Sequence, residues 1–244
     1  MNMTTLTILL FLCLFTLATP RPATARGKHV LMVVTGADRT RLGKPTGIWL
    51  EEYTVPYLLF SRAGYAVTVA SLKGGRAPID PGSVRGESPE EWKNAITLLA
   101  DTRPIDTVSV KDFDAIFFPG GHGAMFDLAD NQQIKHLLTE FEREGKVIAA
   151  VCHGPAGLVG AKRADGTSLV AGMTITSFTD AEESAAGKVA DVPFLLESKL
   201  REEGGRFIVG EPWASHVQVD GKLVTGQNPA SSKATAEAVI RLLQ

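Results

Sequence analysis

Short apolar runs alternate along the chain with longer amphipathic segments. The runs are rich in β-branched and aromatic residues, as expected of strands buried on both faces of a sheet, and they cover residues 29–34, 65–71, 113–121 and 147–151. Segments with apolar residues every three or four positions predict helices at 47–64, 131–146 and 231–244. Shorter strands are expected within 173–178 and 206–210, and a hairpin over 216–226 with its turn at Asp220–Gly221. This alternation predicts a three-layer α/β sandwich whose mostly parallel sheet is covered by helices on both faces.

One segment interrupts the alternation of strands and helices. Residues 74–111 form a long, proline-rich stretch between two predicted strands. Loops of this length are usually functional lids or disordered. Apolar side chains that can anchor the stretch are present at Trp92, Ile96, Leu98 and Leu99. We therefore expect an ordered cap inserted into the domain.

The first 25 residues have the features of a signal peptide. The apolar run at 8–18 has the length of a signal-peptide core and is too short to cross a bilayer comfortably. Ala23–Ala25 offers a small-x-small cleavage site, although no positive charge precedes the run. We expect an exported protein, periplasmic or secreted, with a single mature domain over residues 26–244. The alternative is an uncleaved membrane anchor.

The charge balance excludes some partners. The chain has 25 basic and 27 acidic residues, and Arg21 is the only charged residue before Arg26. Cleavage after residue 25 therefore leaves 24 basic against 27 acidic side chains, a net charge of −3. This argues against nucleic acid or an anionic membrane surface as a partner. The hydrophobic content of 44% supports a substantial core.

The position of the remaining cysteine points to chemistry. Cys13 leaves with the predicted signal, so Cys152 stands alone and no intramolecular disulfide can form. Cys152 follows an apolar strand and precedes a predicted helix, with Ala150 and Gly154 two residues away on either side, which is the pattern of a nucleophile elbow. A helix N-terminus favours a thiolate, so we expect a low-pKa, oxidation-prone thiol. The alternative is a buried structural cysteine.

A glycine turn follows another predicted strand. The backbone N–H groups of Gly120 and Gly121, together with that of His153, are candidates to stabilise an oxyanion; the alternative is an ordinary turn. The dinucleotide spacing G-x-G-x-x-G is absent. The histidines show no H-E-x-x-H or C-x-x-C context, so no metal is expected, and the sequence leaves open whether His122 or His216 approaches Cys152.

Several separated motifs together resemble the ThiJ/PfpI superfamily. They are TGIWLEEYTVPY (46–57), ASLKGGRAPIDPGS (70–83), FFPGGHGAMFDL (117–128), AVCHGPAGL (150–158) and GQNPASS (226–232). The resemblance covers Lys28 to Gln244 and is strongest to the heat-shock-chaperone and glyoxalase III branch. It implies the class I glutamine-amidotransferase-like fold, with a flavodoxin-like sheet and a cap at about 74–111.

The resemblance also implies a catalytic triad. The family's nucleophile falls on Cys152, and its general acid and base falls on His153. The acidic member falls on Glu183 in TSFTDAEES, with Glu182 as the competitor one residue away. Ser177 stands where the family usually has glycine, which leaves the local geometry of that segment in question.

A second glutamate is implied beside the cysteine. In the family it hydrogen-bonds the nucleophile, and here it falls on Glu52, with Glu51 as the competitor. The alternative for each glutamate pair is an exposed helix face. True glutamine amidotransferases use a later His-x-Glu pair, whereas His216 is followed by Gln218, so ammonia transfer is not expected.

The implied function is a cofactor-independent glyoxalase III-type reaction. A thiolate at Cys152 would add to methylglyoxal or glyoxal and release the 2-hydroxy acid, so the cysteine would replace glutathione. A homodimer is expected. Two rivals stay open: a holdase chaperone, which needs exposed apolar patches, and a cysteine amidase or peptidase that uses the same triad.

Overall fold

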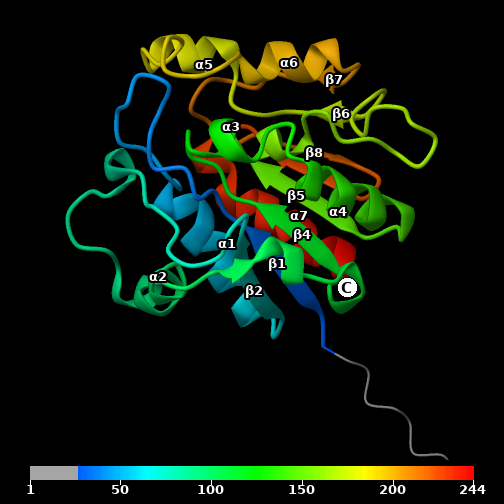
Figure 1. Ribbon diagram of the computed structural model, residues 1–244, viewed down its shortest axis with the longest axis horizontal. Coiled ribbons are helices and arrows are strands. Elements are labelled where there is room, and N and C mark those ends of the chain that lie inside the picture. Colours follow the sequence, from blue (N-terminus) through cyan, green and yellow to red (C-terminus); the bar gives the residue numbers. More distant parts are fainter. Residues whose placement is uncertain (1–26) are drawn as a thin grey trace, which may run out of the picture.

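The computed structural model describes residues 27–244 (Figure 1). The predicted signal peptide at residues 1–25 lies outside the described residues. Among residues 27–244, no helix combines the length and the apolar character needed to span a bilayer.

A seven-stranded sheet forms the centre of the described part of the chain. Its strand order is β3-β2-β1-β4-β5-β9-β8. Every neighbouring pair is parallel except the β8–β9 hairpin. The strands are β1 (His29–Val33), β2 (Ala66–Ser71), β3 (Arg103–Pro104), β4 (Ala115–Phe118), β5 (Val147–Val151), β8 (Val217–Asp220) and β9 (Leu223–Gly226). The predicted mostly parallel α/β fold is confirmed.

Both faces of the sheet are buried because side chains alternate along each strand. In β1, Leu31 and Val33 enter one core while Val30 and Met32 enter the other. Helices lie on both sides of the sheet (Figure 1). The first core packs against α4 (Gln132–Arg143) and α6 (Leu196–Glu202), and the second packs against α1 (Leu50–Arg62) and α7 (Ser232–Leu243).

Two predicted strands form outside the main sheet. They are β6 (Thr174–Ile175) and β7 (Arg206–Phe207), which pair with each other in parallel. The short helix α5 (Asp180–Ala185) lies near them at the top of Figure 1. The remaining helices are α2 (Lys93–Leu98), α3 (Ala124–Asp127), η1 (Pro81–Ser83), η2 (Glu90–Trp92), η3 (Ile105–Thr107), η4 (Val110–Asp112), η5 (Gly154–Leu158) and η6 (Pro229–Ser231), the η elements being 3₁₀ helices.

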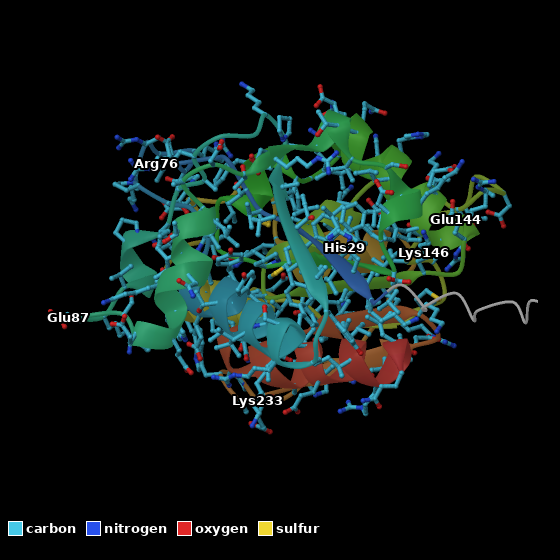
Figure 2. All side chains as sticks on the ribbon, turned by 90° about the horizontal axis from the view of Figure 1, so that it is seen from below. His29, Arg76, Glu87, Glu144, Lys146 and Lys233 are labelled. Atoms are coloured by element: carbon cyan, nitrogen blue, oxygen red, sulfur yellow. The ribbon has the colours of Figure 1, made fainter. Side chains whose placement is uncertain are left out.

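The insertion at 74–111 is ordered and packs on α1. The Tyr53 hydroxyl donates a hydrogen bond of 2.8 Å to the Ala95 carbonyl, and Leu99 of the insertion is buried. Leu98, predicted as an anchor, is exposed instead, because α2 turns Ala95 and Leu99 inward. Glu87, in the same insertion, projects at the opposite end of the molecule from the Glu144–Lys146 ion pair (Figure 2).

Candidate active site

Strand β5 delivers Cys152 to the carboxyl edge of the sheet in a sharp turn. Cys152 has φ +60°, a left-handed conformation that is unusual for a residue with a side chain. Its N–H donates to the Gly226 carbonyl and its own carbonyl accepts from the Phe178 N–H, both at 2.9 Å. Gly154 must be glycine, because a Cβ there would collide with the Phe118 carbonyl. The strained turn is the elbow that the sequence predicts.

The prediction of a low pKa for the thiol is wrong. The chain after Cys152 forms the short 3₁₀ helix η5 in place of the predicted α-helix, so the expected dipole is small. Only 3% of Cys152 is exposed. Burial raises the pKa of the thiol well above its ordinary value, and the nearby Glu52 raises it further, against a smaller opposing effect of the His153 backbone N–H. Cys152 therefore rests as a protonated thiol and needs a base.

His153 is positioned to be that base. Its Nδ1 lies 3.4 Å from the Cys152 Sγ, and its Nε2 lies 2.7 Å from Glu183 Oε2. Burial lowers the pKa of His153 to about 4, with repulsion from His122 as the next cause. His153 is neutral at pH 7, and its hydrogen bond to the Glu183 carboxylate keeps the proton on Nε2. Nδ1 is then free to accept the thiol proton.

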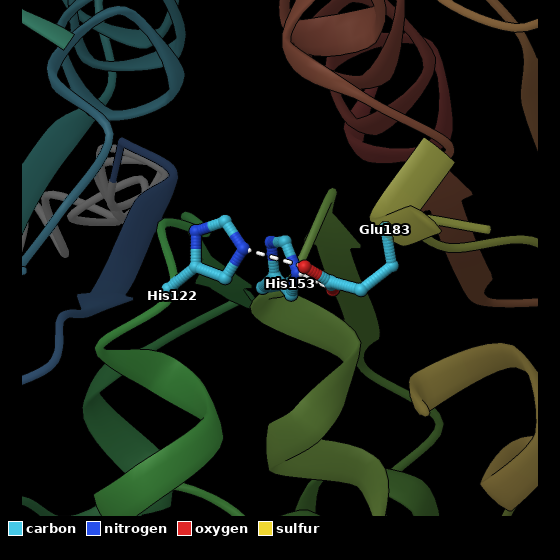
Figure 3. A group of neighbouring side chains, drawn as sticks. All are labelled: His122, His153 and Glu183. Atoms are coloured by element: carbon cyan, nitrogen blue, oxygen red, sulfur yellow. Dashed lines mark hydrogen bonds and ion pairs between the residues drawn. The ribbon is translucent and has the colours of Figure 1, made fainter. Parts of the chain in front are cut away.

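A second histidine binds the same carboxylate (Figure 3). His122 Nε2 lies 2.8 Å from Glu183 Oε1, and the His122 and His153 rings are 4.1 Å apart. Burial alone would raise the pKa of Glu183, but the hydrogen bonds from both histidines lower it to about 2. Glu183 is therefore ionised at any physiological pH. His216, the other histidine left open by the sequence, bonds to Gln218 at 3.0 Å and does not contact Glu183.

The neighbouring glutamate has a different set of partners. Glu182 closes a capping box with Thr179 at the start of α5. Its Oε1 accepts hydrogen bonds from the Trp213 N–H at 2.8 Å and from the Asn228 amide at 2.9 Å. Of the two glutamates, Glu183 forms the hydrogen bonds to the histidines, as the family resemblance implies.

Glu52 is buried beside the thiol, whereas Glu51 is exposed. Glu52 Oε2 accepts the Gly120 N–H at 2.9 Å, and Oε1 is buried without a hydrogen-bonding partner. Burial raises the pKa of Glu52 to about 8, and interaction with Cys152 is the largest influence opposing that rise. At pH 7 the carboxyl is mostly protonated, so it can give a proton to its surroundings and take one back.

The predicted oxyanion donors need one correction. The Gly120 N–H is engaged by Glu52, so it is not a free donor. Gly121 has φ +98° and no room for a Cβ, which would collide with the Gly47 carbonyl. Gly121 and His153 line the cavity and remain candidates.

The site opens into a cavity of about 820 Å³. Cys152, His153 and His122 form its catalytic end. The other lining residues come from the start of α1, the insertion, the α5 region, the loop before β8 and η6. They include Trp49, Glu51, Asp80, Val84, Arg85, Glu87, Trp92, Phe178, Lys188, Trp213 and Pro229.

Three side chains of the site also have the composition of a metal-ligand set. Ligand atoms of His122, His153 and Glu183 all lie within 4.8 Å of one another. The same atoms form the hydrogen bonds of both histidines to Glu183, and the His153–Glu183 bond is one of the two bonds within the triad. Metal independence stays a prediction that a chelator can test.

Comparisons with known proteins agree with this geometry. The sequence model described as the DJ-1/PfpI family matches residues 46–242. The protein named glutathione-independent glyoxalase hsp3101 of Schizosaccharomyces pombe is 34% identical over 219 residues, covering 83% of this chain and 89% of the relative.

Two solved structures are also similar. The crystal structure of glyoxalase III from Candida albicans superposes with a TM-score of 0.80 at 30% identity, covering 88% of this chain and 96% of that one. The Francisella tularensis Rapid Encystment Protein gives a TM-score of 0.85 at 34% identity, covering 89% and 99%. The sequence and the fold therefore point to the same set of relatives.

Proposed function

The chain belongs to the DJ-1/PfpI family, and from this premise we propose that it is a cofactor-independent glyoxalase of the glyoxalase III type. The observation that carries the proposal is the buried Glu52, with a pKa of about 8, beside the Cys152–His153–Glu183 triad. A hydrolase needs only the triad. A carboxyl poised near neutral pH supplies the additional proton transfer that an isomerisation needs.

The first step is addition of the thiol to the substrate aldehyde. His153 Nδ1, 3.4 Å from Sγ, takes the thiol proton as sulfur bonds to the aldehyde carbon, and the carbonyl oxygen takes up a proton to give a hemithioacetal. The ionised Glu183 stabilises the imidazolium that forms. The N–H groups of His153 and Gly121 are the donors available to the developing oxyanion.

The second step is an internal redox isomerisation. A base removes the hydrogen from the former aldehyde carbon to give an enediol, and the adjacent carbon is then protonated to give a thioester. Glu52 is suited to act as this base. Its carboxyl first gives its proton to the substrate oxygen, and the resulting carboxylate can then take the hydrogen from the former aldehyde carbon. The aldehyde carbon is oxidised by two electrons and the ketone carbon is reduced by two, so no external oxidant or reductant is needed. Water hydrolyses the thioester, releases lactate and restores the thiol.

The test compares lactate formation and amide hydrolysis by the wild type and by Cys152→Ala. Methylglyoxal should give lactate with the wild type only, and added glutathione or chelator should not change the rate. Lactate must be measured directly, since arginine and lysine side chains also consume methylglyoxal. Hydrolysis of peptide amides without lactate formation would favour the amidase alternative. Lactate at the level of the Cys152→Ala protein would reject the glyoxalase assignment.

Three further properties are part of the proposal. Export is supported by the apolar run at residues 8–18 and the ATA cleavage site at 23–25. The intact mass of the protein purified from its native host tests export, and retention of residues 1–25 in a soluble pool would contradict it.

A homodimer is the proposed oligomeric state, and its molecular mass in sedimentation experiments tests it. Holdase activity is supported by the adjacent exposed side chains Ile208 and Val209, and suppression of client aggregation should survive in Cys152→Ala.

A further inference from the structure

The cavity over Cys152 is larger and more aromatic than methylglyoxal requires. Its volume of about 820 Å³ lies in the range of pockets that hold drug-sized ligands, whereas methylglyoxal is a three-carbon compound. The sequence contains three tryptophans, and Trp49, Trp92 and Trp213 all line this cavity. Two of them come from α1 and the insertion, and the third comes from the loop before β8. Distant segments therefore contribute their largest aromatic side chains to one space.

Trp213 has features that packing stability does not explain. Its φ is +62°, which is rare for a bulky residue, and 51% of its surface is exposed. The loop is nevertheless held firmly, because the Trp213 N–H donates to the buried Glu182 at 2.8 Å. This hydrogen bond holds the strained backbone in place, and with it an exposed indole at the cavity wall.

An aromatic contact path joins Trp213 to the reacting residues. The Trp213 ring meets Phe178 edge to face at 5.6 Å, and Phe178 lies 4.5 Å from the His153 ring. His153 is adjacent to the Cys152 sulfur. A substrate bonded to that sulfur therefore has an aromatic wall beside it on which a flat or bulky apolar substituent can pack.

We propose that this cavity selects α-oxoaldehydes that carry an aromatic or bulky apolar substituent on the ketone carbon, with Trp213 as a specificity residue. The inference rests on the proposed glyoxalase function and deepens it. The bonds made and broken are those already described, since the substituent takes no part in them. Phenylglyoxal, converted to mandelate, is the probe.

The experiment compares kcat/KM for phenylglyoxal and methylglyoxal by measuring mandelate and lactate. In the wild type the ratio of phenylglyoxal to methylglyoxal should exceed one. Trp213→Gly should lower that ratio about tenfold, the discrimination that one apolar contact surface supplies. Trp213→Phe should restore most of it. Val209→Ala, in the same stretch but outside the cavity lining, is the matched control and should keep the wild-type ratio.

Misfolding cannot imitate a change in this ratio, because glycine suits φ +62° and a loss of folded protein would lower the turnover of both substrates together. A wild-type ratio below one, or the same ratio in all variants within a factor of two, overturns the inference.

If neither compound is turned over, the proposed function fails and the subsite is decided by calorimetry. Mandelate should bind Cys152→Ala at least tenfold more tightly than lactate does, and that preference should be lost when Trp213→Gly is added. Equal binding of the two acids overturns the subsite itself.

Discussion

Glu52→Gln should change how the stability of the protein depends on pH. The amide is the same size as a protonated carboxyl, and it can still accept the Gly120 N–H while remaining neutral. The pKa of Glu52 is 4.5 for an ordinary glutamate and about 8 in the folded protein. Each tenfold difference in proton affinity is worth 1.36 kcal/mol, so the carboxyl contributes about 5 kcal/mol of pH-dependent stability.

The sign follows from the direction of the shift. The folded protein binds the Glu52 proton more tightly than the unfolded chain does. The stabilisation is therefore fully present below pH 4.5 and is lost as the pH rises through about 8. Between pH 5 and pH 8.5, about 4 kcal/mol of it should disappear. His153 and Glu183 also titrate, but they are common to both proteins and cancel in the difference between wild type and variant.

The assay is urea unfolding of wild type and Glu52→Gln at a series of pH values. The difference in unfolding free energy should fall steadily between pH 5 and pH 8.5. Glu51→Gln, the exposed neighbour, is the matched control; because Glu51 is the smallest of the causes that raise the pKa of Glu52, its curve should stay close to the wild-type curve. A difference that stays flat within about 1 kcal/mol would refute the buried, proton-binding carboxyl. Lactate formation by Glu52→Gln should fall by about 10² or more at pH 7.

Other residues of the site give further tests. Iodoacetamide should alkylate Cys152 more slowly than free cysteine at pH 7, because burial raises the pKa of the thiol, and the rate should climb with pH; faster alkylation than free cysteine contradicts this. Glu183→Gln should lower kcat by about 10² or more, because it removes the charge that stabilises the imidazolium, with a small change in melting temperature. Glu182→Gln should mainly lower stability, by about 1–3 kcal/mol, since both Glu182 oxygens accept several buried hydrogen bonds and the amide keeps only one of the two oxygens. The reverse pattern would mean the two roles are exchanged. His122→Phe removes one donor to Glu183 and should lower kcat about tenfold while shifting the pH–rate profile; unchanged kinetics would make His122 only a packing residue.

Much of the fold follows from the order of apolar runs and turn residues. Buried strands such as Val147–Val151 show continuous apolar sequences, and the glycines around Cys152 mark places where backbones approach closely. A buried strand followed by a cysteine and a glycine is enough to predict that the thiol lies at the carboxyl edge of a parallel sheet. The side chains that surround the thiol are not needed for that prediction.

The electrostatics of the site could not be read in the same way. The pKa of Cys152 depends on how deeply the turn is buried and on the short 3₁₀ form of η5, and neither is written in the local sequence. The adjacency of β4 and β5 brings His122 beside His153, and its hydrogen bond to Glu183 on α5 joins residues 61 positions apart. The engagement of the Gly120 N–H by Glu52 likewise depends on packing between distant segments.

Carbon-13 NMR of the reaction tests the account most directly. Methylglyoxal labelled at the aldehyde carbon is mixed with wild type, Glu52→Gln and Cys152→Ala. The wild type should convert the label to the carboxylate of lactate. Glu52→Gln should accumulate a protein-bound hemithioacetal, because addition at Cys152 remains possible while the proton transfer is blocked, and Cys152→Ala should show neither species. Lactate formed by Glu52→Gln at the wild-type rate, or by Cys152→Ala at all, would contradict the assignment of Cys152 as nucleophile and Glu52 as the proton-transfer group.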